Sequence, residues 1–231
     1  MQQIELRNVK MDYRTVEAYK TLRTNVQFSG EDIKVISLTS CTPNEGKSSV
    51  SYALARSFAE NGSKVLYVDC DLRKSVLTGR IMKGKIRYGL VHYLVGQHSF
   101  DEVCCETSLE NLDIVFAGPV PPNPSELLNS KRFGDMIAYA RNHYDMVIVD
   151  TPPVGSVIDG AIVAKQCDGA LLVVASGEIS YRFAQRVKDQ VEKAGCRILG
   201  CVLNKVDMSK GGQYGSYGKY YGKYYGKYYG N

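Results

Sequence analysis

Short apolar runs alternate with helical patterns along most of this chain. Four runs have the length and composition of buried strands and a fifth is a weaker candidate: 34–40, 64–69, 146–151, 169–176 and 198–204. Amphipathic patterns over 48–62 and 183–195 follow two of these runs, and glycines at their ends, Gly62 and Gly195, are expected to stop both helices. Strands that alternate with helices of this length indicate a parallel sheet covered on both faces. We therefore predict a doubly wound, mostly parallel α/β fold.

A further helix is predicted ahead of the first strand, over 15–29. Within it, Glu17, Lys20 and Arg23 recur at three-residue spacing, which brings the three side chains near one face of the helix. On spacing alone, such a set of charges is a solvent-exposed face. The three residues therefore carry no function until another observation gives them one.

The middle and the end of the chain each contain a segment of unusual composition. Residues 117–128 hold four prolines before a short helix that Ser125 is expected to cap, and we interpret them as a rigid connector. Residues 214–231, YGSYGKYYGKYYGKYYGN, hold eight of the seventeen tyrosines and no aliphatic residue. Their frequent glycines raise the entropic cost of any fixed conformation. We predict a domain over 1–208 and a disordered tyrosine-rich tail over 209–231; an adhesive low-complexity segment and a cloning artefact are competing interpretations of the tail.

Charge and cysteine content exclude several classes of protein. The formal net charge is +5, and residues 209–231 contribute +4 through four lysines and no acidic residue, so the predicted domain is nearly neutral. A basic face for nucleic acid is not indicated, and we expect no nucleic-acid partner. The seven cysteines show no C-x-x-C spacing, so reduced thiols are expected rather than disulfides or a zinc site. Because we find neither a secretory leader nor an apolar run of ~20 residues, a cytoplasmic location is expected.

A phosphate-binding loop is predicted between the first strand and the helix that follows it. The segment SCTPNEGKSS, residues 40–49, has the position and the G-K-S ending of a P-loop, although Cys41 replaces the first glycine of the consensus. Such a loop directs backbone N–H groups and a helix N-terminus at phosphate, while Lys47 suits the β- and γ-phosphates and Ser48 suits Mg²⁺. The candidate nucleotide-binding residues are Pro43, Asn44, Glu45, Gly46, Lys47, Ser48 and Ser49. Taken alone, this degenerate loop fits a chance turn equally well.

Carboxylates follow two of the predicted strands at the point where each strand ends. Asp69 closes the strand in VLYVDCDLR, and Asp71 lies two residues further on, on the same side. Asp150 closes the strand in MVIVDTPP, as a Walker B carboxylate does. Ligands of open α/β sheets bind at this edge. Each aspartate by itself is explained as a turn former, but three of them around one P-loop indicate a nucleotide site.

The same motifs resemble those of a known family. The segments TPNEGKSS, VLYVDCDLR and MVIVDTPP are similar to the Walker A, Walker A′ and Walker B motifs of bacterial tyrosine kinases, of the cytoplasmic capsule and exopolysaccharide type of Gram-positive bacteria. Three further segments, EAYKTLRTNVQFSG, GPVPPNPSELLNS and GCVLNKVD, extend the resemblance over essentially the whole chain. The resemblance implies an ATP-dependent protein-tyrosine kinase with a fold of the P-loop NTPase type.

Roles for the site residues follow from this resemblance. Lys47 would stabilise the transferred phosphoryl group, and Ser48 and Asp150 would hold Mg²⁺. Of Asp69 and Asp71, one would take or position the proton of the tyrosine hydroxyl, and the other would support Mg²⁺ through water. We favour Asp69 as the base and Asp71 as the metal-supporting residue.

Asn204 bears on the choice of nucleotide. Asn204 begins N-K-V-D, which matches the N-K-x-D motif with which small GTPases read guanine, whereas in the resembled family the same region contacts adenine. GTPases have no counterpart of the Asp69 and Asp71 pair, so we expect ATP. The competing hypothesis is a nucleotide-switched ATPase or GTPase assembly factor that phosphorylates no protein.

Acceptors and partners are implied as well. The tail tyrosines would be autophosphorylated in trans: Tyr214, Tyr217, Tyr220, Tyr221, Tyr224, Tyr225, Tyr228 and Tyr229. In the family an E-x-x-R-x-x-R motif forms a subunit interface of a ring-shaped octamer, and here it reads Glu17, Lys20 and Arg23, with lysine in place of the first arginine. A separate membrane-anchored activator is expected to recruit the kinase to the inner face of the cell membrane.

Overall fold

The computed structural model describes residues 1–7 and 10–207. Its strands are β1 (Gln2–Leu6), β2 (Val35–Ser40), β3 (Val65–Asp69), β4 (Ile81–Lys83), β5 (Cys104–Thr107), β6 (Leu112–Val115), β7 (Met146–Asp150), β8 (Gly169–Ala175) and β9 (Ile198–Asn204). Its helices are α1 (Tyr13–Gln27), α2 (Lys47–Glu60), α3 (Leu90–Leu94), α4 (Phe100–Val103), α5 (Pro124–Leu128), α6 (Lys131–His143), α7 (Asp159–Ala164) and α8 (Tyr181–Lys193), with a 3₁₀ turn, η1 (Leu77–Arg80). The predicted tail over 209–231, with its eight tyrosines, lies outside the described residues.

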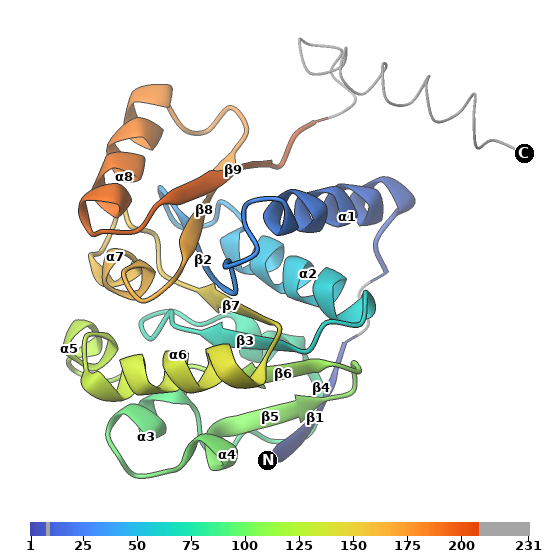
Figure 1. Cartoon of the computed structure of the whole chain (residues 1–231), viewed down its shortest axis with the longest axis vertical. Helices are drawn as coiled ribbons and strands as arrows, with labels where there is room; N and C mark the ends of the chain where they lie inside the picture. The colour runs from blue at the N-terminus through green and yellow to red at the C-terminus, as the bar shows by residue number, and fades with distance from the viewer. Residues whose placement is uncertain (8–9, 208–231) are drawn as a thin grey trace, which may run out of the picture.

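The strands of the described residues form one sheet in the order β4-β1-β5-β6-β3-β7-β2-β8-β9 (Figure 1). Neighbouring strands from β6 to β9 are parallel, whereas β5 is antiparallel to β6, and β4 is antiparallel to β1. The five predicted strands occupy adjacent places from β3 to β9. The prediction of a doubly wound, mostly parallel α/β fold is therefore confirmed.

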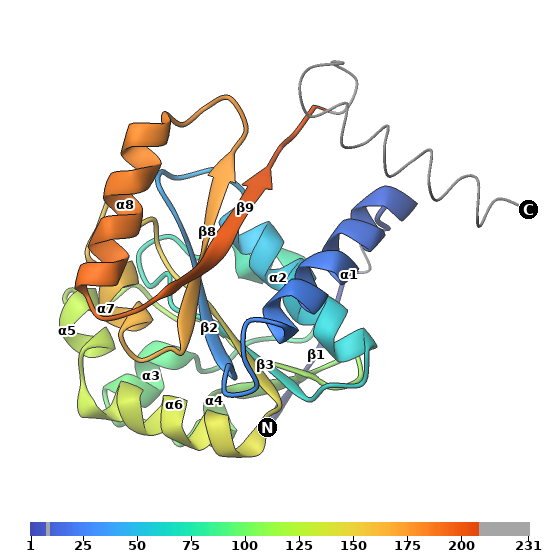
Figure 2. The same cartoon turned by 45° about the horizontal axis from the view of Figure 1, so that its top comes forward.

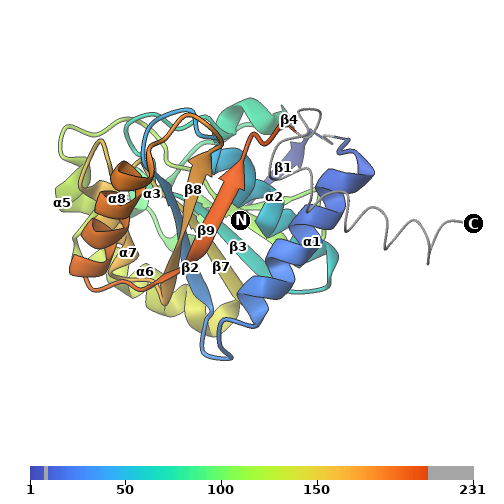
Figure 3. The ribbon, with the colours of Figure 1, turned by 90° about the horizontal axis from the view of Figure 1, so that it is seen from above.

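Helices cover both faces of the sheet because the side chains of each strand alternate between two cores. On β3, Val65 and Tyr67 face the core that α1 and α2 cover, whereas Leu66 and Val68 face the core that α3, α5 and α6 cover. A third apolar cluster lies between α7, α8 and β8. Figures 2 and 3 show α1 and α2 on one side of the sheet and α5 to α8 on the other.

The strand order brings the predicted motifs to one edge of the sheet. Because β7 lies between β3 and β2, the carboxyl ends of these three parallel strands are neighbours. Asp69 at the end of β3 is in register with Asp150 at the end of β7. The P-loop leaves β2 at the same edge, where ligands of open α/β sheets bind.

Two features of the fold differ from the sequence prediction. Strands β1, β4, β5 and β6 were not predicted; they are only three to five residues long and mix polar with apolar residues. Helix α5 begins after Asn123 with Pro124 in its first turn, so the predicted Ser125 cap is wrong. The hydroxyl of Ser125 instead donates to Asp159 at 2.6 Å.

No helix in the described part of the chain is long and apolar enough to cross a membrane.

Candidate active site

The P-loop connects β2 to α2, and two of its residues adopt the left-handed backbone conformation. These are Asn44, with a φ of 68°, and Gly46, with a φ of 89°. Gly46 occupies the N-cap position of α2 and brings no side-chain cap, so the first amides of this fourteen-residue helix are available to an anion. A Cβ atom on Gly46 would lie 2.1 Å from Nδ2 of Asn204. The left-handed backbone angle favours glycine here, and the Asn204 amide takes the space that a Cβ atom would need.

The buried side chain of Glu45 stabilises the P-loop through hydrogen bonds. Its side chain is fully buried, and one carboxylate oxygen accepts hydrogen bonds from the amide and the hydroxyl of Thr42. The other oxygen accepts from the amide of Ala175 on β8 at 2.9 Å. The side-chain amide of Asn204 donates to the Glu45 carbonyl at 2.8 Å. The carboxylate of Glu45 and the amide group of Asn204 therefore fix the loop to the ends of β8 and β9.

Cys41, at the position of the missing consensus glycine, is fully buried. Burial raises the pKa of its thiol to about 12, so the thiol stays protonated and serves packing. Gly155, in the segment after β7, approaches the Cys41 backbone closely. A Cβ atom there would lie 2.1 Å from the Cys41 carbonyl oxygen and 2.9 Å from the ring of Phe183. The lack of a side chain at Gly155 thus lets the segment after β7 pack against the P-loop.

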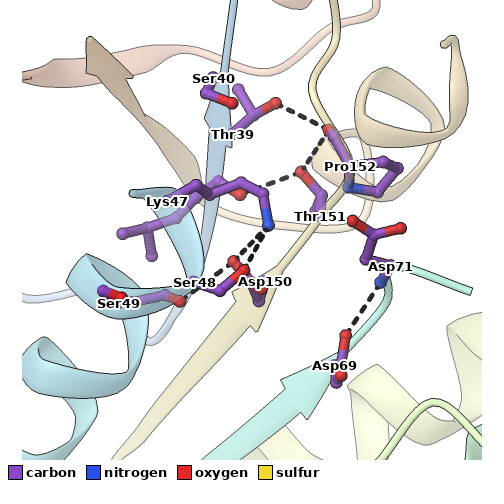
Figure 4. Close-up of polar contacts among 12 residues, drawn as sticks. Thr39, Ser40, Lys47, Ser48, Ser49, Asp69, Asp71, Asp150, Thr151 and Pro152 are labelled. Atoms are coloured by element: carbon purple, nitrogen blue, oxygen red, sulfur yellow. Dashed lines mark hydrogen bonds and ion pairs between the residues drawn. The ribbon is translucent and has the colours of Figure 1, made fainter. Parts of the chain in front are cut away.

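Lys47 extends from the start of α2 to the carboxylate at the end of β7 (Figure 4). Its Nζ lies 2.8 Å from Oδ1 of Asp150 and 3.0 Å from Oγ of Ser48. The side chains of Lys47 and Asp150 are only 6% and 3% exposed. The same Asp150 oxygen accepts a hydrogen bond from the Ser51 hydroxyl at 3.0 Å, and this hydroxyl lies 3.0 Å from that of Tyr67. This is a buried ion pair with the extra hydrogen bonds that such a pair requires.

The two aspartates of the A′ segment have different environments. Asp69 is 1% exposed, and it accepts hydrogen bonds from the Asp71 amide at 3.1 Å and the Ser75 hydroxyl at 2.5 Å. Burial, and then the negative charge of Asp150, raise the pKa of Asp69 to about 7. Asp71 is half-buried, and its Oδ1 accepts from the Lys74 amide at 2.9 Å. Asp71 is therefore the more accessible carboxylate of the two.

A cleft of about 350 Å³ opens between the P-loop, the A′ loop (residues 70–76) and the segment after β7. The predicted residues on its wall are Pro43, Asn44, Glu45, Gly46, Lys47, Ser48, Ser49 and Asp71. A second cavity of about 380 Å³ shares Asp71, Arg73 and Lys74 with this cleft and continues towards residues 86–92 and 116–120. Asp71 thus lies where the two cavities meet.

Hydroxyl groups that the sequence patterns did not reveal also hold the site together. The Thr39 hydroxyl donates to the Pro152 carbonyl at 3.1 Å, and the Thr151 hydroxyl donates to the Leu38 carbonyl at 3.0 Å (Figure 4). Both bonds join the end of β2 to the segment after β7. Of these supporting hydroxyl groups, only that of Ser51 could have been predicted from the sequence, because Ser51 lies four residues after Lys47 and hence on the same helix face.

The residues of the predicted oligomer interface lie on α1. Glu17 and Lys20 form an exposed ion pair at 2.8 Å. Arg23 is directed at α2, where its Nη1 donates to the carbonyl of Ser57 at 2.8 Å. Its Nε is buried and has no hydrogen-bond partner in the part of the chain that the structure describes. Arg23 therefore joins α1 to α2 within one chain, which its spacing from Glu17 did not reveal.

Comparison with known proteins agrees with this geometry. The AAA-domain family matches residues 33–194, from just before β2 to just after α8. The fold, the P-loop and the carboxylates at the strand ends define a nucleotide-binding protein of the P-loop NTPase class.

Individual relatives define the family more narrowly. Tyrosine-protein kinase CpsD of Streptococcus pneumoniae is 44% identical over 224 residues, which cover 95% of this chain and 99% of CpsD. The kinase domain of the Escherichia coli tyrosine kinase ETK matches with a TM-score of 0.80 and 31% identity over 89% of each chain. The chimeric protein CapA2B2 matches with a TM-score of 0.78 and 29% identity, covering 88% of this chain and 93% of that one. The chain belongs to the bacterial tyrosine-protein kinases and is a protein-tyrosine kinase.

Proposed function

We propose that this kinase transfers the γ-phosphoryl group of ATP to tyrosines of its own C-terminal segment. The observation that carries the proposal is the convergence of Lys47, Asp150 and the Asp69 and Asp71 pair beside the P-loop cleft. The sequence supplies the acceptors, Tyr214, Tyr217, Tyr220, Tyr221, Tyr224, Tyr225, Tyr228 and Tyr229. A nucleotide switch has no use for such a cluster, which supports phosphoryl transfer over switching.

Ser48 and Asp71 on the cleft wall, together with Asp150 buried beside Lys47, fit a magnesium ion. Ser48, Asp71 and Asp150 offer hydroxyl and carboxylate oxygens, the donors that Mg²⁺ takes. Within the described ranges, no group of three or more histidine, cysteine or acidic side chains is arranged to hold a metal. This donor set suits an ion that keeps several waters and binds substrate phosphates. When bound, Mg²⁺ supplies neutralisation of the phosphate charge.

Each side chain then has a part in phosphoryl transfer. Lys47 moves its ammonium from Asp150 to the transferred phosphoryl group, while the P-loop amides orient the phosphates. An acceptor tyrosine has an ordinary pKa near 10, so a carboxylate at its hydroxyl assists the reaction at neutral pH. The sequence favoured Asp69 as this base and Asp71 as the metal-supporting residue, but the burial of Asp69 and the place of Asp71 where two cavities meet support Asp71 as the base. Asp71 would then both take the tyrosine proton and support Mg²⁺ through water. Asp69 then positions Asp71 by accepting a hydrogen bond from the Asp71 amide.

Transfer between subunits is the second part of the proposal. We assign Glu17, Lys20 and Arg23 to the subunit interface of a ring, of eight subunits by family resemblance. The exposed Glu17–Lys20 pair supports a polar contact there, because both charged side chains are open to a second subunit. A ring brings the tyrosine segment of one subunit to the cleft of its neighbour.

Family membership supports a role in capsular or exopolysaccharide synthesis. We propose that a separate membrane-anchored protein recruits the kinase from the cytoplasm to the inner face of the membrane and activates it. ATP is the proposed donor. Competition binding with ADP and GDP tests this choice, since preferential GDP binding would support the guanine-reading alternative at Asn204.

A mixing experiment tests transfer in trans. Full-length Asp71→Asn chains, expected to be inactive, are combined with active chains truncated after residue 211 and with labelled ATP and Mg²⁺. The expected label is phosphotyrosine on the Asp71→Asn chains only. Full-length Asp189→Asn, which changes an exposed carboxylate of α8, is the control and retains wild-type labelling.

Three other outcomes would count against parts of the proposal. No label on the Asp71→Asn chains in the mixture means transfer in cis. Wild-type labelling by Asp71→Asn alone means that the carboxylate is misassigned. Phosphate release without phosphotyrosine, in the wild type, favours the nucleotide switch.

A further inference from the structure

Arg73 ends the A′ segment VLYVDCDLR and has no part in the mechanism above. Its Nε donates to Oδ2 of Asp159 at 2.6 Å and its Nη2 donates to Oδ1 of the same carboxylate at 3.2 Å. Nη2 also lies 3.3 Å from the hydroxyl of Ser125, and this hydroxyl donates to Asp159 at 2.6 Å. The three side chains therefore form a closed set of hydrogen bonds with a bidentate ion pair, the geometry that arginine makes with a carboxylate.

This cluster joins three segments that are far apart in the sequence. Arg73 lies in the A′ loop, Ser125 in α5 after the proline-rich connector, and Asp159 at the start of α7. Asp159 is fully buried, whereas the Arg73 side chain is 43% exposed. Burial acts to raise the pKa of Asp159, but the hydrogen bonds from Arg73 and Ser125 outweigh it and leave that pKa below its ordinary value. Asp159 is therefore a buried anion that depends on Arg73 as its counter-charge.

The bonds inside the A′ loop make Arg73 important for Asp71. The loop has no helix or strand of its own over residues 70–76. Two hydrogen bonds close its turn: the Asp71 amide donates to the Asp69 carboxylate, and the Lys74 amide donates to the Asp71 carboxylate. Arg73 lies between these bonded residues, and its side chain fixes the turn to α5 and α7. The wall of the cleft that carries Asp71 is thus anchored to Asp159, in addition to the hydrogen bond from the Cys70 amide to the Asp150 carbonyl and the buried side chain of Leu72.

We propose that Arg73, Asp159 and Ser125 form a clamp that positions Asp71 at the cleft, with Arg73 and Asp159 as positioning residues. The clamp also gives the proline-rich connector a function, since it presents Ser125 to Asp159. This inference rests on the proposed function only in the role given to Asp71. The clamp itself is a property of the protein without nucleotide.

The test uses full-length protein and four variants: Arg73→Gln, Asp159→Asn, the double variant and Ser125→Ala. Arg141→Gln is the matched control, because Arg141 makes a similar two-oxygen pair with Asp168 at 2.7 Å beside the amino-terminal end of β2. Amide hydrogen exchange of residues 70–76 is measured without nucleotide. Steady-state transfer gives kcat and the KM for ATP, and fluorescent ADP binding is titrated with Mg²⁺.

Loss of the clamp should loosen the loop and misplace Asp71. We expect exchange over 70–76 to become about tenfold faster in Arg73→Gln and Asp159→Asn, and kcat to fall roughly 10- to 100-fold, since a displacement near 1 Å has effects of this size. The KM for ATP should stay within threefold, and more Mg²⁺ should be needed for half-maximal ADP binding. The double variant should be no worse than the worse single variant, because both remove one interaction. Arg141→Gln should change none of these quantities.

Several results would overturn the clamp. One is unchanged exchange over 70–76 in both single variants. Another is loss of activity in Arg73→Gln but not in Asp159→Asn, which would mean that Arg73 acts directly on a ligand. Ser125→Ala removes one hydroxyl, so it decides the question if Arg73→Gln fails to fold: it should give exchange and kcat changes of the same sign, about two- to fivefold. If the wild type transfers no phosphate, the proposed function fails, while exchange and Mg²⁺-dependent ADP binding still test the clamp.

Discussion

Replacing Lys47 by methionine should lower the free energy of unfolding as well as abolish transfer. The Lys47 ammonium lies 2.8 Å from Asp150, and the two side chains are 6% and 3% exposed. Methionine fills a similar volume, so the packing cost is small. The substitution leaves Asp150 as a buried carboxylate with one hydrogen bond, from Ser51 at 3.0 Å, beside the buried Asp69. Removal of one partner of a buried pair costs about 3–5 kcal/mol.

This cost has a ceiling that depends on pH. A buried carboxylate without a partner can take up a proton, so it lowers the free energy of unfolding by no more than the free energy of that protonation. Protonation costs about 1.4 kcal/mol for each pH unit above the ordinary pKa near 3.9. The ceiling is therefore about 6 kcal/mol at pH 8 and about 1.5 kcal/mol at pH 5. We expect Lys47→Met to lower the free energy of unfolding by about 3 kcal/mol at pH 8 and by about 1 kcal/mol at pH 5.

Urea unfolding at the two pH values, with EDTA and without nucleotide, measures both losses. Lys131→Met is the control, because Lys131 forms an exposed pair with Asp135 on α6 and should change stability by less than about 0.5 kcal/mol. Equal stability of Lys47→Met and wild type at pH 8, or a loss that grows as pH falls, would refute the reasoning.

Three further perturbations probe the site. Asp69 has a pKa of about 7 when folded and an ordinary pKa of 3.8, so between these values folding takes up a proton, and wild-type stability should fall between about pH 4 and pH 7. Asp69→Asn should remove this fall and gain up to about 4 kcal/mol over wild type at pH 8, measured by urea unfolding in EDTA; a parallel pH profile would contradict the raised pKa. Gly155→Ala places a Cβ atom 2.1 Å from the Cys41 carbonyl oxygen and should cost about 1–3 kcal/mol in thermal unfolding, whereas Gly79→Ala, with open space around it, should not. Asn204→Ala removes the hydrogen bond to the P-loop and should weaken ADP binding about fivefold, or about 1 kcal/mol; unchanged affinity would show that the bond does not hold the loop.

The central part of the fold was predictable because its strands are buried on both faces. Strands β2, β3, β7 and β8 are mostly apolar and are buried along their whole length, since parallel strands between two helical layers meet no solvent. Strands β1 and β5 lie near the other edge of the sheet and read QQIEL and CCET. Runs so short and mixed carry no clear period, so the sequence did not reveal them.

The motifs of the site were predictable, but their supports were not. Lys47, Asp69, Asp71 and Asp150 follow from strand ends and a P-loop, and the structure brings them together; their catalytic roles stay predictions. The partners of these residues are set by tertiary contacts. Arg73 and Asp159, for example, are 86 positions apart, and no local pattern relates them. Ser125 looked like a helix cap because local spacing gives no sign of a carboxylate arriving from α7.

The measurement that tests the account most directly is the fate of the γ-phosphate. Wild-type protein is incubated with labelled ATP and Mg²⁺, and the product is subjected to phosphoamino-acid analysis and to mapping by mass spectrometry. The account predicts phosphotyrosine alone, within Tyr214 to Tyr229, and none in a protein with Lys47→Met. Release of inorganic phosphate without phosphotyrosine, or label confined to residues 1–207, would contradict it.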